Sequence, residues 1–415
     1  MSEAPADRPE PSGAASGVPA DRPEPSGMVS KGSDSILELL TKRDILVCCG
    51  TGGVGKTTTA AALALEGARQ GRSSCVVTID PARRLADSLG VAQLSNSPHE
   101  IQGDWPGKLW AMMLDPKRTF DELVAQYASD AEQAERILSN RIYRSLSEAL
   151  SGTHEYMAME KLFELHNDRR FDLVVVDTPP TRNALDFLDA PGRLVRFLEN
   201  RLFRLLLMPT RAYLRAVSIA TRAFLRTVSK VVGVEMVQDA VAFFQAFEGM
   251  EEGFRARAES VSKLLVESGT AFVLVASPRR DSVEEAEYFA GKLKDANIEV
   301  EALVMNRLHP SFDDHEATKV DSKSAARPEK RGARRSSSGP KPSNRLSPEQ
   351  AREALAVLRQ NRDELNAVVE RESNSYEGLL DFLGDVAVAR VPFLAGDVHD
   401  LEGLEVVASY LVGPG

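Results

Sequence analysis

The sequence contains few of the residues that crosslink a protein or anchor it in a membrane. Only three of its 415 residues are cysteines, which is too few for a disulfide framework and is typical of a reducing compartment. No apolar run reaches the roughly 18 residues of a membrane span. The first residues have neither the basic nor the apolar region of a secretory signal. We therefore expect a soluble, cytoplasmic protein, which a partner could bring to a membrane.

Basic residues are also in deficit. Lys and Arg total 51 against 61 Asp and Glu, a net charge of −10, which argues against a general nucleic-acid binder. Hydrophobic residues make up 43% of the chain, enough for a real core. The length allows two or three domains, or one large α/β domain.

Two segments lack apolar periodicity altogether. Residues 1–34 are rich in Pro, Gly and Ser and repeat PADRPEPSG at 5–13 and 19–27, so we expect a disordered tail. Residues 317–347 carry nine basic and two acidic residues. We expect a disordered basic insert there. The alternative is a contact for an acidic partner, or a phosphorylation switch at Ser336–Ser338.

Between these segments, short apolar runs alternate with helical patterns. The runs typical of buried strands are 44–50, 73–80, 108–115, 171–177, 271–277, 300–306 and 386–392. This alternation predicts an α/β fold with a mostly parallel central sheet flanked by helices. Residues 186–268 contain no strand candidate, so we expect a helical subdomain inserted into an α/β domain formed by 35–185 and 269–415.

A phosphate-binding loop is the strongest local signal. The loop follows an apolar strand, opens a helix and fits G-x-x-x-x-G-K-[ST]; its residues are Gly50, Thr51, Gly52, Gly53, Val54, Gly55, Lys56, Thr57 and Thr58. Glycines let consecutive N–H groups point at phosphate oxygens, and the helix N-terminus adds its positive end. Lys56 would reach the β- and γ-phosphates, and the Thr57 hydroxyl would ligate Mg²⁺. The pattern predicts a P-loop nucleoside triphosphatase.

Two carboxylates end predicted strands near this loop. Asp177 is the last residue of FDLVVVD, at the sheet edge where the sites of α/β proteins lie, and its carboxylate could help to hold Mg²⁺. Asp80 closes SSCVVTID and could hold the attacking water in line with the γ-phosphate. The alternative for Asp80 is a helix N-cap as its sole role.

Together these residues resemble the ArsA-type, or anion-transporting, ATPase family, which includes the arsenite-pump ATPase and the factor that targets tail-anchored membrane proteins. The resemblance covers about 36–315 and 350–412. Its blocks are GTGGVGKTT at 50–58, Asp80-Pro81-Ala82 with Leu85-Ala86-Asp87, Asp177-Thr178-Pro179-Pro180-Thr181 with Leu185-Asp186-Phe187-Leu188, Asn306-Arg307-Leu308, and Val391-Pro392-Phe393.

The resemblance implies Mg²⁺-dependent ATP hydrolysis by a dimer that holds nucleotide at its interface. Lys56 and Asp80 would be catalytic, and Asp177 would hold Mg²⁺ through a water. Asn306, Pro392 and Phe393 would contact adenine. The family's client-binding helices would fall in the basic amphipathic segment 200–234. The segment could dock an acidic partner, an anionic membrane or a hydrophobic client. The alternative is an ordinary surface helix.

The sequence departs from the family at informative positions. The family's signature lysine, which reaches across the dimer to the partner's phosphates, is Thr51 here. We therefore favour pairing with a paralogue that keeps the lysine, with a weakly active homodimer as the alternative. No cysteine follows Cys75, so we expect neither an arsenite site nor a zinc site, and Mg²⁺ is the one metal we expect.

Three functions remain open from the sequence. The first is an ATP-hydrolysing dimeric switch that couples turnover to a client or membrane partner. The second is a nucleotide-sensing regulatory subunit with negligible activity alone. The third is a ParA-like, DNA-associated ATPase that uses the insert at 317–347, against which the net charge argues.

Overall fold

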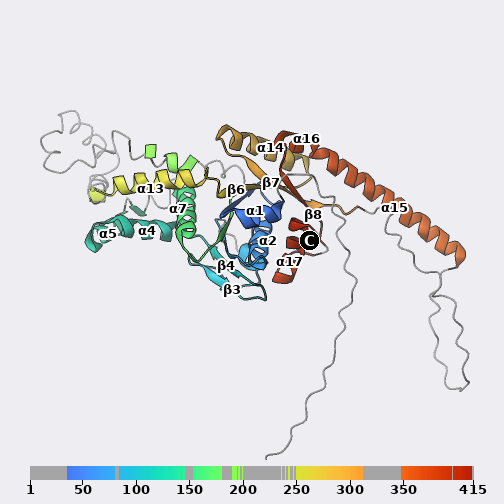
Figure 1. Cartoon of the computed structure of the whole chain (residues 1–415), viewed down its shortest axis with the longest axis horizontal. Coiled ribbons are helices and arrows are strands. Elements are labelled where there is room, and N and C mark those ends of the chain that lie inside the picture. Colours follow the sequence, from blue (N-terminus) through green and yellow to red (C-terminus); the bar gives the residue numbers. More distant parts are fainter. Residues whose placement is uncertain are drawn as a thin grey trace, which may run out of the picture.

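The computed structural model describes residues 35–79, 84–141, 153–179, 249–311, 347–394 and 396–413, with isolated positions between 143 and 246. In this part of the chain, eight strands form one sheet in the order β3-β4-β2-β5-β1-β6-β7-β8 (Figure 1). The strands are β1 (Ile45–Gly50), β2 (Ser73–Thr78), β3 (His99–Ile101), β4 (Lys108–Met113), β5 (Leu173–Asp177), β6 (Thr270–Ala276), β7 (Val300–Leu308) and β8 (Ala387–Pro392). All neighbours are parallel except β3, which pairs antiparallel with β4.

The predicted fold class is confirmed. Each of the seven apolar runs forms a strand, and the strands are covered by helices on both faces. The edge strand β3 was not predicted, because three residues with one buried side chain carry no readable alternation.

In the described ranges, one helix precedes the first strand, one follows the last, and the others fall between strands, as the alternation predicts. They are α1 (Ile36–Lys42), α2 (Lys56–Arg69), α3 (Arg84–Ser88), α4 (Pro116–Tyr127), α5 (Ala131–Leu138), α7 (Thr153–Asn167), α13 (Glu251–Leu264), α14 (Arg280–Asp295), α15 (Pro348–Ser375), α16 (Glu377–Leu383) and α17 (Leu401–Val412). Strand β1 shows which helices cover each face of the sheet. Its Leu46 and Cys48 pack into the core shared with α1, α2 and α17. Its Ile45, Val47 and Cys49 pack into the core shared with α7, α13, α14 and α16.

A third apolar cluster lies outside the two sheet cores. It is built from α4, α5, the first half of α7 and the first half of α13, with members such as Val124, Ile137, Tyr156 and Phe254. Figure 1 shows these helices together to one side of the sheet. The helical subdomain predicted at 186–268 stays a prediction, because only α13 and scattered positions of that range are described. The segments 1–34, 200–234 and 317–346 lie outside the described residues.

Helices α7 and α13 join the third cluster to the sheet. Met157 of α7 packs in the third cluster, whereas Met159 and Leu162 of the same helix pack against the sheet. Arg257 of α13 donates its Nε–H to Glu160 Oε1 of α7 at 2.7 Å. The glutamate side chain is 4% exposed and the arginine 18%, so the ion pair is largely buried.

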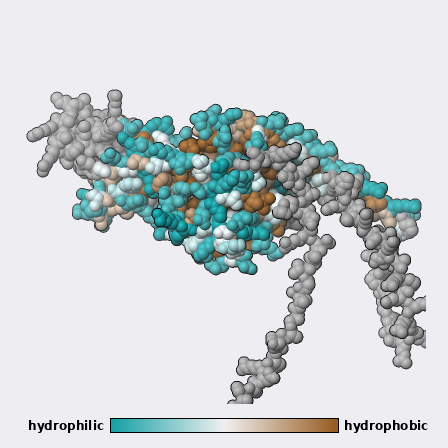
Figure 2. Space-filling model, in the orientation of Figure 1, coloured by the Kyte–Doolittle hydropathy of each residue, from teal (hydrophilic) through white to brown (hydrophobic). Residues whose placement is uncertain are grey.

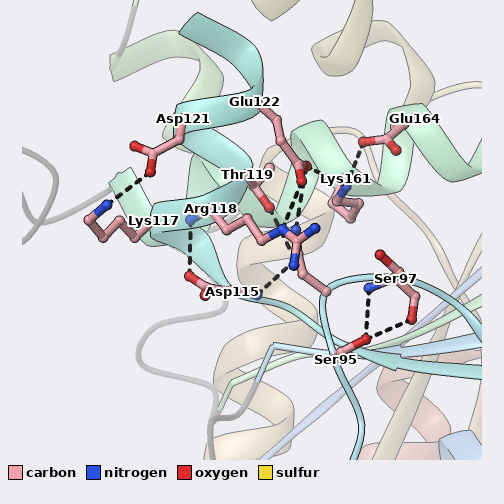
Figure 3. Close-up of polar contacts among 11 residues, drawn as sticks. Ser95, Ser97, Asp115, Lys117, Arg118, Thr119, Asp121, Glu122, Lys161 and Glu164 are labelled. Carbon is pink, nitrogen blue, oxygen red and sulfur yellow. Dashed lines mark hydrogen bonds and ion pairs between the residues drawn. The ribbon is translucent and has the colours of Figure 1, made fainter. Parts of the chain in front are cut away.

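A second polar contact ties α4 to α7. Lys161 is 3% exposed, and its ammonium lies 3.3 Å from Glu122 of α4 and 2.7 Å from Glu164 of its own helix (Figure 3). Asp115 caps the start of α4 by accepting the backbone N–H of Arg118 at 3.0 Å. The helices α4, α7 and α13 are therefore joined to one another by charged contacts as well as by apolar packing.

Helix α15 leaves the body of the molecule as a long arm (Figure 1). Its first turn begins with a capping box between Ser347 and Gln350, a strong helix start. The arm carries apolar side chains among hydrophilic ones (Figure 2), and Leu355 and Leu358 are 47% and 64% exposed. Only its last turn returns to the sheet. Among the described residues, none of the helices combines the length and apolar character of a membrane span.

Candidate nucleotide site

The phosphate loop connects β1 to α2 at the carboxyl end of the sheet. β1 lies between β5 and β6, so the loop is flanked by the ends of both neighbours. Gly50 has φ of +148°, and a Cβ there would lie 2.0 Å from the carbonyl oxygen of Val275 in β6. Gly55 has φ of +97°, and its Cβ would lie 2.2 Å from Nδ2 of Asn306. Backbone conformation therefore favours glycine at both positions, and the close approach to the backbone of β6 requires it at Gly50.

Lys56 is held inside the loop. It is 7% exposed, and its ammonium donates to the backbone carbonyl of Thr51 at 2.8 Å. This contact places the cation across the mouth of the loop. Gly52 and Gly53 are exposed at the same place. The loop can thus offer one ammonium and several backbone N–H groups to a phosphate, which is the chemistry its sequence predicts.

The side chain of Thr51 points into the protein. The residue is 5% exposed, and its hydroxyl lies 3.2 Å from the hydroxyl of Ser282 in α14. Ser282 Oγ also accepts the backbone N–H of Ser277 at 3.0 Å. The side chain at the second position of the loop therefore contacts a helix of its own chain.

Thr57 and Asp177 meet in the structure. The Thr57 hydroxyl donates to Asp177 Oδ2 at 2.7 Å, and the Thr78 hydroxyl donates to the same oxygen at 2.8 Å. Asp177 is 1% exposed. A hydroxyl beside a buried carboxylate at the start of α2 gives the hard oxygen donors that Mg²⁺ prefers. The residues present therefore fit a Mg²⁺ site.

Asn306 lies against the phosphate loop. Its Nδ2 donates to the carbonyl of Val54 at 2.7 Å, and its Oδ1 accepts the N–H of Arg307 at 2.9 Å. Arg307 has φ of +63°, and the pairing of β7 with β8 shifts register between Asn306 and Leu308. This irregularity ends the strand beside the loop. The predicted contact of Asn306 with adenine stays a prediction.

Pro392 and Phe393 lie at the end of β8, next to the end of β7. The N–H of Phe393 donates to the carbonyl of Leu308 at 2.7 Å, and the Phe393 ring is 59% exposed. An exposed aromatic ring held by backbone pairing at this edge is suited to stack on a base. The structure thus brings the predicted base-contacting residues to the neighbouring ends of β7 and β8, and their roles stay a prediction.

Asp80 lies outside the described residues, which stop at Ile79 and resume at Arg84. The N–H of Ile79 donates to the carbonyl of Asp177 at 3.1 Å, so the residue before Asp80 lies beside the predicted Mg²⁺ ligand. Its predicted catalytic role is not tested by this geometry.

All three cysteines are buried and unbridged. Burial is the main cause that raises the pKa of Cys48 well above its usual range, with the charge of Asp177 adding to it. Burial raises the pKa of Cys49 to about 12 and also raises that of Cys75. These thiols are packing residues. Within the described ranges, no group of three or more His, Cys, Asp or Glu side chains is arranged to hold a metal ion.

Two residues of the site were missed from the sequence. Thr78 is the last residue of β2 and stands beside Asp177 in the sheet register, a pairing that strand order alone could have suggested. Ser282 lies 231 residues from Thr51, and a serine in the first turn of a helix gives no signal of such a contact.

Comparison with known proteins places the chain in a family. The family model described as anion-transporting ATPase matches residues 43–330. The chain is 29% identical to ATPase GET3 of Malassezia globosa over 263 residues, covering 63% of this chain and 72% of that protein. It is 26% identical to ATPase get3 of Schizosaccharomyces pombe over 66% of this chain and 76% of that protein. It is 25% identical to ATPase get3 of Aspergillus niger over 92% of this chain and 93% of that protein. The chain therefore belongs to the anion-transporting ATPase family and is an ATPase.

Proposed function

We propose that this ATPase is a Mg²⁺-dependent dimeric switch whose partner is a paralogue that keeps a lysine at the position of Thr51. The observation that carries the proposal is the pairing of Thr57 with Asp177 at 2.7 Å, directly beside the loop that holds Lys56. This arrangement supports phosphate binding and metal binding in one place.

Thr57 and Asp177 would hold the metal, the hydroxyl directly and the carboxylate through a water. Bound Mg²⁺ supplies charge neutralisation on the β- and γ-phosphate oxygens. Lys56 would add its ammonium to the same oxygens. Asn306, Pro392 and Phe393 would bind the base, and Asp80 would orient the attacking water. These residues position substrate and water, which is most of what phosphoryl transfer requires of a protein.

The inward side chain of Thr51 supports pairing with a paralogue. A threonine that is 5% exposed and bound to Ser282 offers no cation to a neighbouring subunit. A partner that retains a lysine would supply that charge to this chain's site. A trans-acting cation on the developing phosphate charge is worth about 10³-fold or more in rate, so the pairing would decide where turnover occurs.

Turnover would be coupled to a client or to an anionic membrane surface through the helical region, with 200–234 as the contact. ATP would bind the closed dimer preferentially, and hydrolysis would shift the population toward the open one. Cross-linking of a client to 200–234 that depends on the bound nucleotide would support this step. Nucleotide-independent cross-linking would contradict it.

The test is ATP turnover of the purified chain alone, with the paralogue added, and as the Thr51→Lys variant. We expect slow turnover alone, a large increase with the paralogue, and an increase in the variant, because a homodimer of that variant carries trans lysines. Brisk turnover by the unmodified chain alone would overturn the pairing. Tight nucleotide binding with no increase under either condition would favour the second candidate, a nucleotide-sensing subunit. The buried Thr51 side chain is the observation behind that candidate as well.

A further inference from the structure

His309 lies beside the predicted base-contacting ring. It follows Asn306 by three residues, just beyond the end of β7. The centroids of the His309 and Phe393 rings are 6.0 Å apart, with 39° between their planes. The His309 side chain is 41% exposed and Phe393 is 59% exposed. Two tilted, solvent-accessible rings therefore lie at the carboxyl ends of adjacent strands, at the edge where the base is expected.

Glu372 fixes the orientation of this imidazole. One carboxylate oxygen, Oε2, accepts the backbone N–H of His309 at 2.9 Å. The other, Oε1, lies 2.6 Å from the ring nitrogen Nδ1. An ionised carboxylate can only accept hydrogen bonds, so Nδ1 must carry a proton. In the neutral ring, Nε2 is then a hydrogen-bond acceptor.

The fixed tautomer has a consequence for base recognition. Adenine presents an N6 amino group, a donor, where guanine presents O6, an acceptor. An acceptor at Nε2 can therefore bind the amino group of adenine and would oppose the O6 of guanine. We propose that His309 is a specificity-determining residue that selects ATP over GTP, with Glu372 as the positioning residue that sets its tautomer. This inference rests on the proposed nucleotide site.

A purely structural role for the pair is the competing explanation. Glu372 belongs to the last turn of α15, and Ser375 in the same turn donates to the carbonyl of Pro278 at 3.0 Å. The His309–Glu372 contact could simply fasten the arm to the sheet. In that case its loss would weaken the binding of both nucleotides alike, or lower stability, and would leave the ratio of their affinities unchanged.

Glu372→Gln separates the two explanations without a change of size. The backbone N–H of His309 requires an acceptor, so the glutamine oxygen is drawn to it. The glutamine NH₂ group then faces Nδ1 and donates to it. Nδ1 becomes an acceptor and Nε2 becomes a donor, which suits O6 of guanine. His309→Phe keeps an aromatic ring and removes both nitrogens. Glu370→Gln is the matched control, since Glu370 is exposed on the same helix and undergoes the same change.

The experiment measures the affinities of the full-length chain for ATPγS and GTPγS, with Mg²⁺ at pH 8, by titration calorimetry. We expect the unmodified chain and Glu370→Gln to prefer the adenine nucleotide by about tenfold or more. We expect His309→Phe to lower that ratio about tenfold, and Glu372→Gln to lower it at least as far or to reverse it.

Each other outcome counts against a defined claim. A ratio that stays constant in both variants overturns the inference, even if both affinities fall, and leaves the nucleotide site standing. Equal binding of the two nucleotides by the unmodified chain also overturns it. Absence of binding by the unmodified chain would instead refute the proposed function.

Discussion

The hydroxyl of Thr51 lies 3.2 Å from that of Ser282, so the second residue of the phosphate loop faces helix α14 of its own chain. Ser282 is joined in turn to the backbone of Ser277. One residue further on, Pro278 accepts the hydrogen bond from Ser375 at the end of α15. The phosphate loop, the connection from β6 to α14 and the root of the exposed arm are therefore linked through consecutive polar contacts.

The contact between Thr57 and Asp177 predicts a metal-dependent defect. Thr57→Val removes the hydroxyl that would ligate Mg²⁺ and that donates to Asp177 at 2.7 Å. We expect the Mg²⁺ concentration for half-maximal ATP turnover to rise by about 10- to 100-fold. Thr41→Val, at an exposed position of α1, is the control and should titrate as the unmodified chain does. An unchanged Mg²⁺ dependence of Thr57→Val would remove Thr57 from the site.

Gly50 should tolerate no side chain. Gly50→Ala combines a φ of +148° with a Cβ placed 2.0 Å from a backbone oxygen of Val275. We expect a loss of about 3 kcal/mol or more in the free energy of unfolding. Gly71→Ala isolates the backbone effect, because Gly71 has φ of +87° and no atom within 4 Å of its Cβ position. That variant should lose about 1–2 kcal/mol. Equal losses in urea unfolding would show that the close approach to β6 is unimportant.

The buried pair of Glu160 and Arg257 should be costly to break. Arg257→Met keeps an apolar stem but removes the guanidinium, whose carbon lies 4.1 Å from the centroid of the Phe163 ring, and leaves the carboxylate of Glu160 buried without its cation. We expect a loss of about 3 kcal/mol in unfolding free energy. Adding Glu160→Leu should restore part of that loss, because it removes the isolated charge.

The same substitution at a surface pair provides the control for this measurement. Arg280 pairs with Glu284, and their side chains are 91% and 61% exposed. Arg280→Met should change stability by less than about 1 kcal/mol, because exposed pairs contribute little. Comparable losses at Arg257 and Arg280 would contradict a special role for the pair between α7 and α13.

The sequence predicted what depends on local pattern. The seven apolar runs became strands because buried parallel strands need continuous apolar residues, and the loop around Lys56 is specified by its own spacing. Contacts across long separations could not be predicted in this way. Asn306 donates to Val54, 252 residues away, and Glu372 orients His309, 63 residues away. Such contacts depend on strand order and on a register shift at the end of β7, neither of which has a local signature.

The burial of the cysteines predicts slow chemical modification of the folded chain. The thiolate is the reactive form, and a pKa of about 12 for Cys49 leaves about one thiolate in 10⁴ at pH 8. We expect iodoacetamide at pH 8 to leave all three cysteines unmodified in the native protein and to modify all three after unfolding in guanidinium. Mass spectrometry distinguishes these outcomes. Rapid labelling of the native chain would mean that β1 and β2 open readily.

The predicted role of Asp80 means that its substitution should affect ATP hydrolysis but not ATP binding. Asp80 follows Ile79, whose N–H donates to the backbone of Asp177, so this part of the chain leaves β2 beside the predicted metal ligand. A carboxylate that orients the attacking water contributes to the transition state and little to ATP binding. Asp80→Asn should therefore keep the ATP affinity within about threefold and lower turnover by about 10²- to 10⁴-fold. The variant Asp295→Asn, in an exposed ion pair with Lys292, should affect neither quantity. If Asp80 serves only as a helix cap, Asp80→Asn would keep both the stability and the turnover number of the unmodified chain, because asparagine caps a helix as well as aspartate does.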